Sequence, residues 1–175
     1  FRFTGLPARE YFPESQTKFF SSEMSSQFSF DSDADGHVTG LVLHQSGMEQ
    51  GAPRITVEDA KAVEDGLTAR IKGNTPSPGS EAALRHQLAA VETGEFDYAA
   101  FSPELAALVR SQALAASQRF AALGALKSLT FKSVSQRGFD VYDAVFEHGE
   151  LNCWIWPLAD GKIKGFRYLA ASQAP

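Results

Sequence analysis

The acidic run Asp31-Ser-Asp33-Ala-Asp35-Gly36 has the spacing with which calcium-binding loops begin. In such loops alternate carboxylates converge on the ion and the glycine permits a sharp turn. The twelfth position needs a bidentate glutamate, but Val42 stands there, and strand-like sequence flanks the run on both sides. We therefore interpret the run as a hairpin loop, in which Asp and Gly tolerate positive φ angles, with a weak cation site as the alternative.

The segment Ser15-Gln-Thr-Lys18 fits a pattern of serine acyl-transfer enzymes, in which a lysine assists the serine from one helical turn away. It follows Pro13 and runs into Phe19-Phe20, which is typical of extended chain. Residues three apart on a strand point to opposite faces, so Lys18 would not assist the Ser15 hydroxyl. We expect no nucleophilic role for Ser15.

Other catalytic and metal-binding signals are missing from the sequence. The histidines His37, His44, His86 and His148 show no His-x-His or His-Glu-x-x-His spacing. No nucleophile elbow, phosphate-binding glycine loop or dinucleotide fingerprint occurs. The motifs therefore predict no catalytic residue, no metal and no cofactor.

Composition excludes two classes of partner. The chain has 175 residues, with 16 Lys and Arg against 21 Asp and Glu, and a net charge of −5. Its basic residues are scattered, so the counterion release that drives nucleic-acid binding is missing. The longest Ala/Leu-rich run is broken by Arg110, Gln112 and Ser117, so no membrane span is expected. The single Cys153 excludes an internal disulfide.

Hydrophobic periodicity divides the chain into three parts, and the predicted fold class is α+β. Short strands alternate with turns over residues 1–55, a partial antiparallel β-meander that begins with Phe1-Arg2-Phe3. Residues 56–79 form a connecting helix and a Pro-rich linker, and residues 80–175 form two further helices and a four-stranded antiparallel sheet. Thr56 with Asp59 should cap the first helix, and Ser102 the third.

The last sheet allows its register to be predicted from three turns, at residues 135–138, 148–149 and 160–161. This register puts an almost wholly apolar set of side chains on one face, and the ones that could line a ligand pocket there are Phe131, Tyr142, Phe146, Cys153 and Tyr168. The alternative is that these side chains belong to the hydrophobic core and bind no ligand.

The opposite face of this sheet carries Trp154, Trp156, Arg167 and Asp143. Two tryptophans on a solvated face are costly, and Trp and Arg are common at interface hot spots, so we expect a partner to cover them. A three-residue turn at His148 is the alternative, and it would reverse the two faces and place both tryptophans in the core.

Several segments resemble known modules. The runs Tyr11-Phe-Pro-Glu-Ser-Gln-Thr-Lys-Phe-Phe20, 33–36 and 38–45 resemble the β-rich module of unknown function that follows the catalytic domain of bacterial serine β-lactamase-like hydrolases and class C penicillin-binding proteins. The runs 76–84, 94–98, 102–106 and 160–163 look like tails of the same proteins. Their order of helices and sheet is similar to the nuclear transport factor 2-like, ketosteroid-isomerase-like cone, and the resemblance implies a periplasmic or secreted protein.

The cone fold hosts both enzymes and non-catalytic binders, so the fold alone does not decide the function. Isomerases of this fold place a carboxylate base and a tyrosine inside the cone. In the predicted register Asp143 and Glu147 lie on the other face, which leaves Tyr142 and Tyr168 without a base.

We therefore expect a non-catalytic accessory region that docks on a serine hydrolase domain outside this chain, or on a second copy of itself. The alternative is a small cone-fold enzyme or binding domain that takes a small apolar ligand under the helices.

Overall fold

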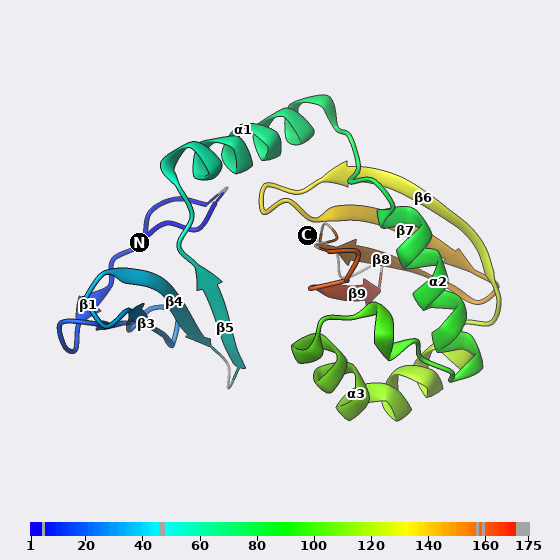
Figure 1. Cartoon of the computed structure of the whole chain (residues 1–175). Helices are drawn as coiled ribbons and strands as arrows, with labels where there is room; N and C mark the ends of the chain where they lie inside the picture. Colours follow the sequence, from blue (N-terminus) through cyan, green and yellow to red (C-terminus); the bar gives the residue numbers. More distant parts are fainter. Residues whose placement is uncertain (5, 46–47, 157, 159, 171–175) are drawn as a thin grey trace. The chain divides into compact units, whose positions relative to one another are not determined.

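The computed structural model describes residues 1–170 of the chain, apart from residues 5, 46–47, 157 and 159. It has the predicted α+β order: a five-stranded antiparallel sheet, three α-helices, and then a four-stranded antiparallel sheet (Figure 1). The chain divides into two compact units, residues 1–66 and 67–175. The boundary lies inside α1 (Val57–Gly73), within the segment predicted to connect the two parts.

The N-terminal sheet is a meander whose strands pair in chain order. Its strands are β1 (Phe12–Pro13), β2 (Lys18–Ser21), β3 (Ser26–Ser32), β4 (Val38–Gln45) and β5 (Met48–Pro53). A β-bulge at Asp31/Ser32 shifts the register of β3 against β4 by one residue. Because of this shift, Phe28 and Phe30 share one face with their partners Leu43 and Leu41.

Aromatic packing holds this first unit together. Phe28 is buried, and the Phe19 ring stacks on it with centroids 5.1 Å apart. The prediction that Phe1-Arg2-Phe3 begins a strand is wrong, since the strands described start at β1. Instead Phe1 exchanges backbone hydrogen bonds of 2.8 and 2.9 Å with Arg9, and its ring lies 4.8 Å from that of Phe28. An aromatic contact with Phe28 and the hydrogen bonds to Arg9 therefore hold Phe1 in place of strand pairing.

The first and third helices have the capping residues that the sequence predicts. The Thr56 hydroxyl accepts a hydrogen bond from the Asp59 amide at 3.0 Å and donates to the Asp59 carboxylate at 2.8 Å. Helix α2 (Ser80–Thr93) ends at Gly94, whose φ of 77° is the left-handed conformation of a C-cap. A short 3-10 turn, η1 (Tyr98–Ala100), precedes α3 (Pro103–Ala121), which is capped by Ser102.

The C-terminal sheet has the predicted faces. Its strands are β6 (Leu126–Val134), β7 (Asp140–Phe146), β8 (Gly149–Ile155) and β9 (Phe166–Ala170), paired in chain order. Phe146 pairs with Gly149, so the two-residue turn is Glu147-His148, one residue earlier than predicted. Moving the turn by one residue changes the cross-strand partner of each residue by two positions. Because side chains alternate with a period of two, each residue keeps its predicted face. Asp160 and Gly161, with φ of 54° and 70°, form the last turn as predicted.

One face of this sheet packs under α2 and α3 (Figure 1). Their buried side chains, among them Leu84, Leu88 and Phe120, form one hydrophobic cluster with residues of β6, β7 and β8. None of the helices described is long and apolar enough to cross a membrane.

Candidate functional site

The residues predicted to line a pocket come together on the face under the helices. Phe131, Tyr142, Cys153 and Tyr168 are successive cross-strand partners and form one row across all four strands of the C-terminal sheet. Phe146 lies on the same face of β7, and its ring contacts Phe120 edge to face. These five side chains therefore share the face of the sheet that packs under the helices.

The polar groups of this row are held in neutral forms. Tyr142 is fully buried, and its hydroxyl shares a hydrogen bond of 2.8 Å with the Ser80 hydroxyl. Burial raises the pKa of Tyr142 and of Tyr168. Burial, with a smaller contribution from the Asp143 charge, raises the pKa of the Cys153 thiol to about 12. Groups held neutral in this way suit a packed interior, and none of them is poised for acid–base work at pH 7.

Sequence analysis missed a carboxylate on this face. Asp140 lies two residues before Tyr142 on β7 and is fully buried. One of its oxygens accepts from the Arg70 guanidinium at 2.5 Å, and the other accepts from the Ser77 amide at 2.8 Å. The expectation that no carboxylate shares the face of Tyr142 is thus wrong. The alternation of Asp140 with Tyr142 on one strand was the available signal.

This carboxylate is already engaged by its own chain. Arg70 neutralises its charge from the last turn of α1, and Ser77 binds it from the linker before α2. A buried base needs an oxygen free to accept a proton from a substrate. The arrangement therefore fixes the linker to the sheet and does not present a catalytic base.

The four residues of the predicted interface lie on the opposite face, but they differ in exposure. The Arg167 guanidinium stacks on Trp154, 4.5 Å from the ring centroid, and Trp154 is only 8% exposed. Trp156 is 40% exposed and contacts the Phe139 ring edge to face at 4.5 Å. Asp143 accepts from the side chains of Asn152 and Lys132. Trp156 thus offers most of the apolar contact area, because neighbours already cover Trp154.

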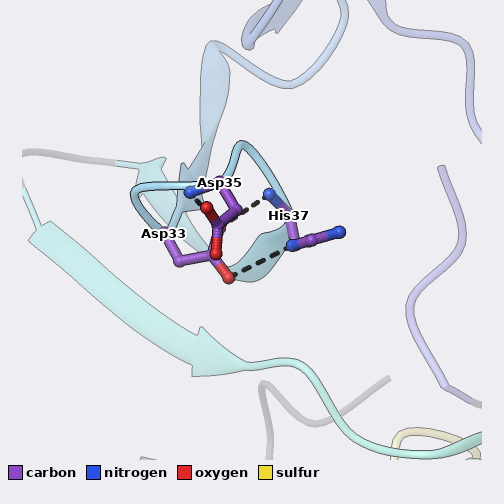
Figure 2. Close-up of side chains that lie close together, drawn as sticks. All are labelled: Asp33, Asp35 and His37. Carbon is purple, nitrogen blue, oxygen red and sulfur yellow. Dashed lines mark hydrogen bonds and ion pairs between the residues drawn. The ribbon is translucent and has the colours of Figure 1, made fainter.

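The acidic loop joins β3 to β4, as the hairpin interpretation predicts. Figure 2 shows the side chains of Asp33, Asp35 and His37 close together in this loop. Each offers one ligand atom, and these atoms lie within 4.8 Å of one another. One Asp33 oxygen accepts the backbone amides of Asp35 and His37 at 3.0 and 2.8 Å, and His37 Nδ1 lies 3.5 Å from the other oxygen. All three residues are exposed. Asp33 therefore serves as the turn-forming residue of the loop.

The Ser-x-x-Lys segment bends at residues 14–17 before β2, so the expectation of extended chain is wrong for Ser15. The Ser15 hydroxyl accepts hydrogen bonds from the backbone amides of Thr17 and Lys18 at 3.2 and 3.1 Å. Lys18 lies at the start of β2, where its cross-strand partner is Ser29 of β3. Lys18 therefore lies opposite Ser29 on the neighbouring strand.

The other face of the N-terminal sheet carries a chain of hydrogen bonds that sequence analysis did not find. Ser29 Oγ lies 3.3 Å from His44 Nε2, and His44 Nδ1 lies 3.1 Å from a carboxylate oxygen of Glu49. The three residues belong to β3, β4 and β5. The bulge at Asp31/Ser32 puts Ser29 and His44 on the same face, and no sequence motif marks it.

A scan against protein-family models, a search of curated proteins and a search of solved structures each gave no match to this chain. The function must therefore be argued from the residues and their geometry.

Proposed function

We propose that this chain is an accessory region that docks on a bacterial serine hydrolase domain of the β-lactamase-like class, lying outside this chain. Two observations support the proposal. The segments 11–20, 33–36 and 38–45 resemble modules that follow such domains, and the outer face of the C-terminal sheet exposes Trp156 beside Arg167 and Asp143.

The observation that carries the docking role is the exposure of Trp156. A tryptophan that is 40% exposed leaves a large apolar area in water, which association with a partner removes. Arg167 lies in direct register with Trp154 and extends the same face, and Asp143 adds a charge to it. A face with an aromatic anchor and both signs of charge suits a polar-rimmed protein interface.

The alternative function, a ligand site under the helices, has one observation in its favour. Gln87 of α2 is 1% exposed, and neither atom of its amide has a hydrogen-bond partner among the described residues. A buried amide left in that state is costly, and a polar ligand group or an internal water would satisfy it.

The docking proposal is tested with the hydrolase domain that we expect the native reading frame to encode next to this chain. Its affinity for the chain is measured by calorimetry before and after Trp156→Ala. We expect Trp156→Ala to weaken binding by 2 kcal/mol or more, roughly thirtyfold, with the fold intact by circular dichroism. Trp154→Ala is the matched comparison, and it should lower the free energy of unfolding by about 3 kcal/mol because Trp154 is already buried within the chain.

Two results would overturn the docking function. One is a reading frame that encodes no hydrolase domain beside this chain. The other is an affinity unchanged by Trp156→Ala, which would leave the ligand site under the helices as the better-supported function.

A further inference from the structure

We propose that Ser29 is a nucleophile for acyl transfer from small carboxylic esters with an aryl leaving group, with His44 as its general base and Glu49 as the residue that positions His44. The inference goes beyond the accessory role and depends only on the N-terminal unit. It is carried by the hydrogen-bonded order of the three side chains, Ser29 Oγ to His44 Nε2 and His44 Nδ1 to Glu49.

The carboxylate of Glu49 fixes the tautomer of His44. An ionised carboxylate can only accept a hydrogen bond, so the Nδ1 atom that faces it must carry the proton. The Nε2 atom then presents a lone pair to Ser29 and accepts its hydroxyl proton. This division of roles is the one that a serine, histidine and carboxylate triad requires, and it is recognised by geometry and not by sequence position.

Two neighbours on the same face supply further parts of a site. Lys18 is the direct cross-strand partner of Ser29, so its ammonium can reach the negative charge that develops on an attacked carbonyl oxygen. Phe20 is the diagonal neighbour of Ser29, and its ring lies 5.9 Å from that of Phe12. Both rings are exposed, and they form an apolar surface suited to an aryl group.

The reaction is written as two steps. Ser29 Oγ attacks the ester carbonyl carbon while its proton passes to His44 Nε2. The bond to the aryl oxygen then breaks, and His44 gives the proton to that oxygen, so that a phenol leaves and His44 is neutral again. Water then attacks the acyl carbon while His44 Nε2 takes one of its protons. The bond to Ser29 Oγ breaks, and His44 returns that proton to Ser29 Oγ, which releases the carboxylic acid and restores the serine hydroxyl.

The sheet also limits the rate. The Phe30 amide, next to Ser29, donates to the Thr17 carbonyl within the ladder and is not free to bind an oxyanion. Loss of one oxyanion-hole donor costs about 100- to 1000-fold in serine hydrolases. We therefore expect slow turnover that relies on Lys18 for charge stabilisation, with covalent labelling of Ser29 as the clearer signal.

The experiment treats the intact chain with a fluorophosphonate probe and with 4-nitrophenyl acetate, and locates the adducts by peptide mass spectrometry. With the fluorophosphonate, the bond from Ser29 Oγ to phosphorus forms, fluoride leaves, and the proton passes to His44. We expect the adduct on Ser29, and we expect His44→Gln to lower the labelling rate by about 100-fold. Glu49→Gln should lower the rate by roughly tenfold, because Glu49 acts only through His44, and Glu49→Asp should restore part of it.

The chain offers matched controls. His86 is hydrogen-bonded to Asp97 at 3.1 Å, and no serine hydroxyl is bonded to it among the described residues, so His86→Gln should leave the labelling rate unchanged. Ser111 is an exposed serine that donates to its own helix, and Ser111→Ala should also have no effect. An adduct on another residue, no adduct at all, or equal labelling of wild type and His44→Gln would overturn the proposal. Mapping the adduct in the wild-type chain needs no variant to fold.

Discussion

The polar side chains of the two sheets differ in how far water can reach them. On the face of the C-terminal sheet that packs under the helices, Asp140 and Tyr142 are fully buried. They are hydrogen-bonded to Arg70 of α1 and Ser80 of α2. On the N-terminal sheet, Ser29, His44 and Glu49 bond to one another across three strands, and the His44 side chain is 38% exposed.

This difference shows where chemistry can occur. Buried groups that satisfy each other contribute to folding and specify one packing arrangement, but no substrate reaches them. Partly exposed groups contribute little to stability, because water competes for their hydrogen bonds, yet a substrate can reach them. Measurements of stability therefore probe the buried groups of the C-terminal sheet. Measurements of reactivity probe the partly exposed groups of the N-terminal sheet.

The largest effect on stability is expected from Asp140→Ala. The change leaves the Arg70 charge and the Ser77 amide without their partner in a buried site. Removing one member of a buried ion pair typically costs about 3–5 kcal/mol. Urea unfolding followed by tryptophan fluorescence measures the loss, since both tryptophans lie within residues 67–175.

Asp143→Ala is the matched control for this comparison. Its side chain is 44% exposed and pairs with Lys132, but it also accepts from Asn152, which is only 5% exposed. We therefore expect a loss of about 1–2 kcal/mol, less than that of Asp140→Ala. Equal losses for the two variants would show that burial does not separate Asp140 from Asp143.

A loss of stability that is smaller for each pH unit, but accumulates, is expected at alkaline pH. The pKa of the Cys153 thiol is about 12 in the folded chain, whereas an unfolded cysteine ionises near pH 8.5. Above that pH the unfolded state releases a proton that the folded state retains, so the free energy of unfolding falls by about 1.4 kcal/mol per pH unit up to pH 12. Tyr142 and Tyr168, whose pKa values are also raised, add to this loss above about pH 10.

Cys153→Ala isolates the contribution of the thiol. In this variant the alkaline loss should begin nearer pH 10, where Tyr142 and Tyr168 start to ionise in the unfolded chain. Superimposable stability curves for the two proteins between pH 8 and pH 10 would contradict the effect of burial on Cys153.

The fold was largely predictable, because its signals are local. The capping residues Thr56 and Ser102 mark helix starts, and the turn residues set the faces of the C-terminal sheet even though one turn lies a residue earlier than expected. The ion pair of Asp140 could not be predicted from local signals. Its ion-pair partner Arg70 lies 70 residues earlier in the chain, on a different element, and no periodicity joins the two.

The cluster on the N-terminal sheet was hidden for another reason. A regular hairpin around the acidic loop, with Ser32 opposite Val38, would put Ser29 and His44 on opposite faces. The bulge at Asp31/Ser32 shifts β3 by one residue, and side chains that would have been separated then share a face. A one-residue irregularity has no clear mark in the sequence, yet it decides which groups can bond.

The smallest effect is expected from calcium at the loop of Asp33, Asp35 and His37. One Asp33 oxygen is already used by two backbone amides, and Val42 stands where a closing glutamate is needed, so calcium would have few free ligands. An ion stabilises a protein only to the extent that its concentration exceeds its dissociation constant. The melting temperature in about 1 mM calcium should therefore match that in a chelator to within about one degree. A rise of several degrees that disappears in Asp33→Asn would show that this exposed loop, like the buried Asp140 cluster, is organised around a bound charge.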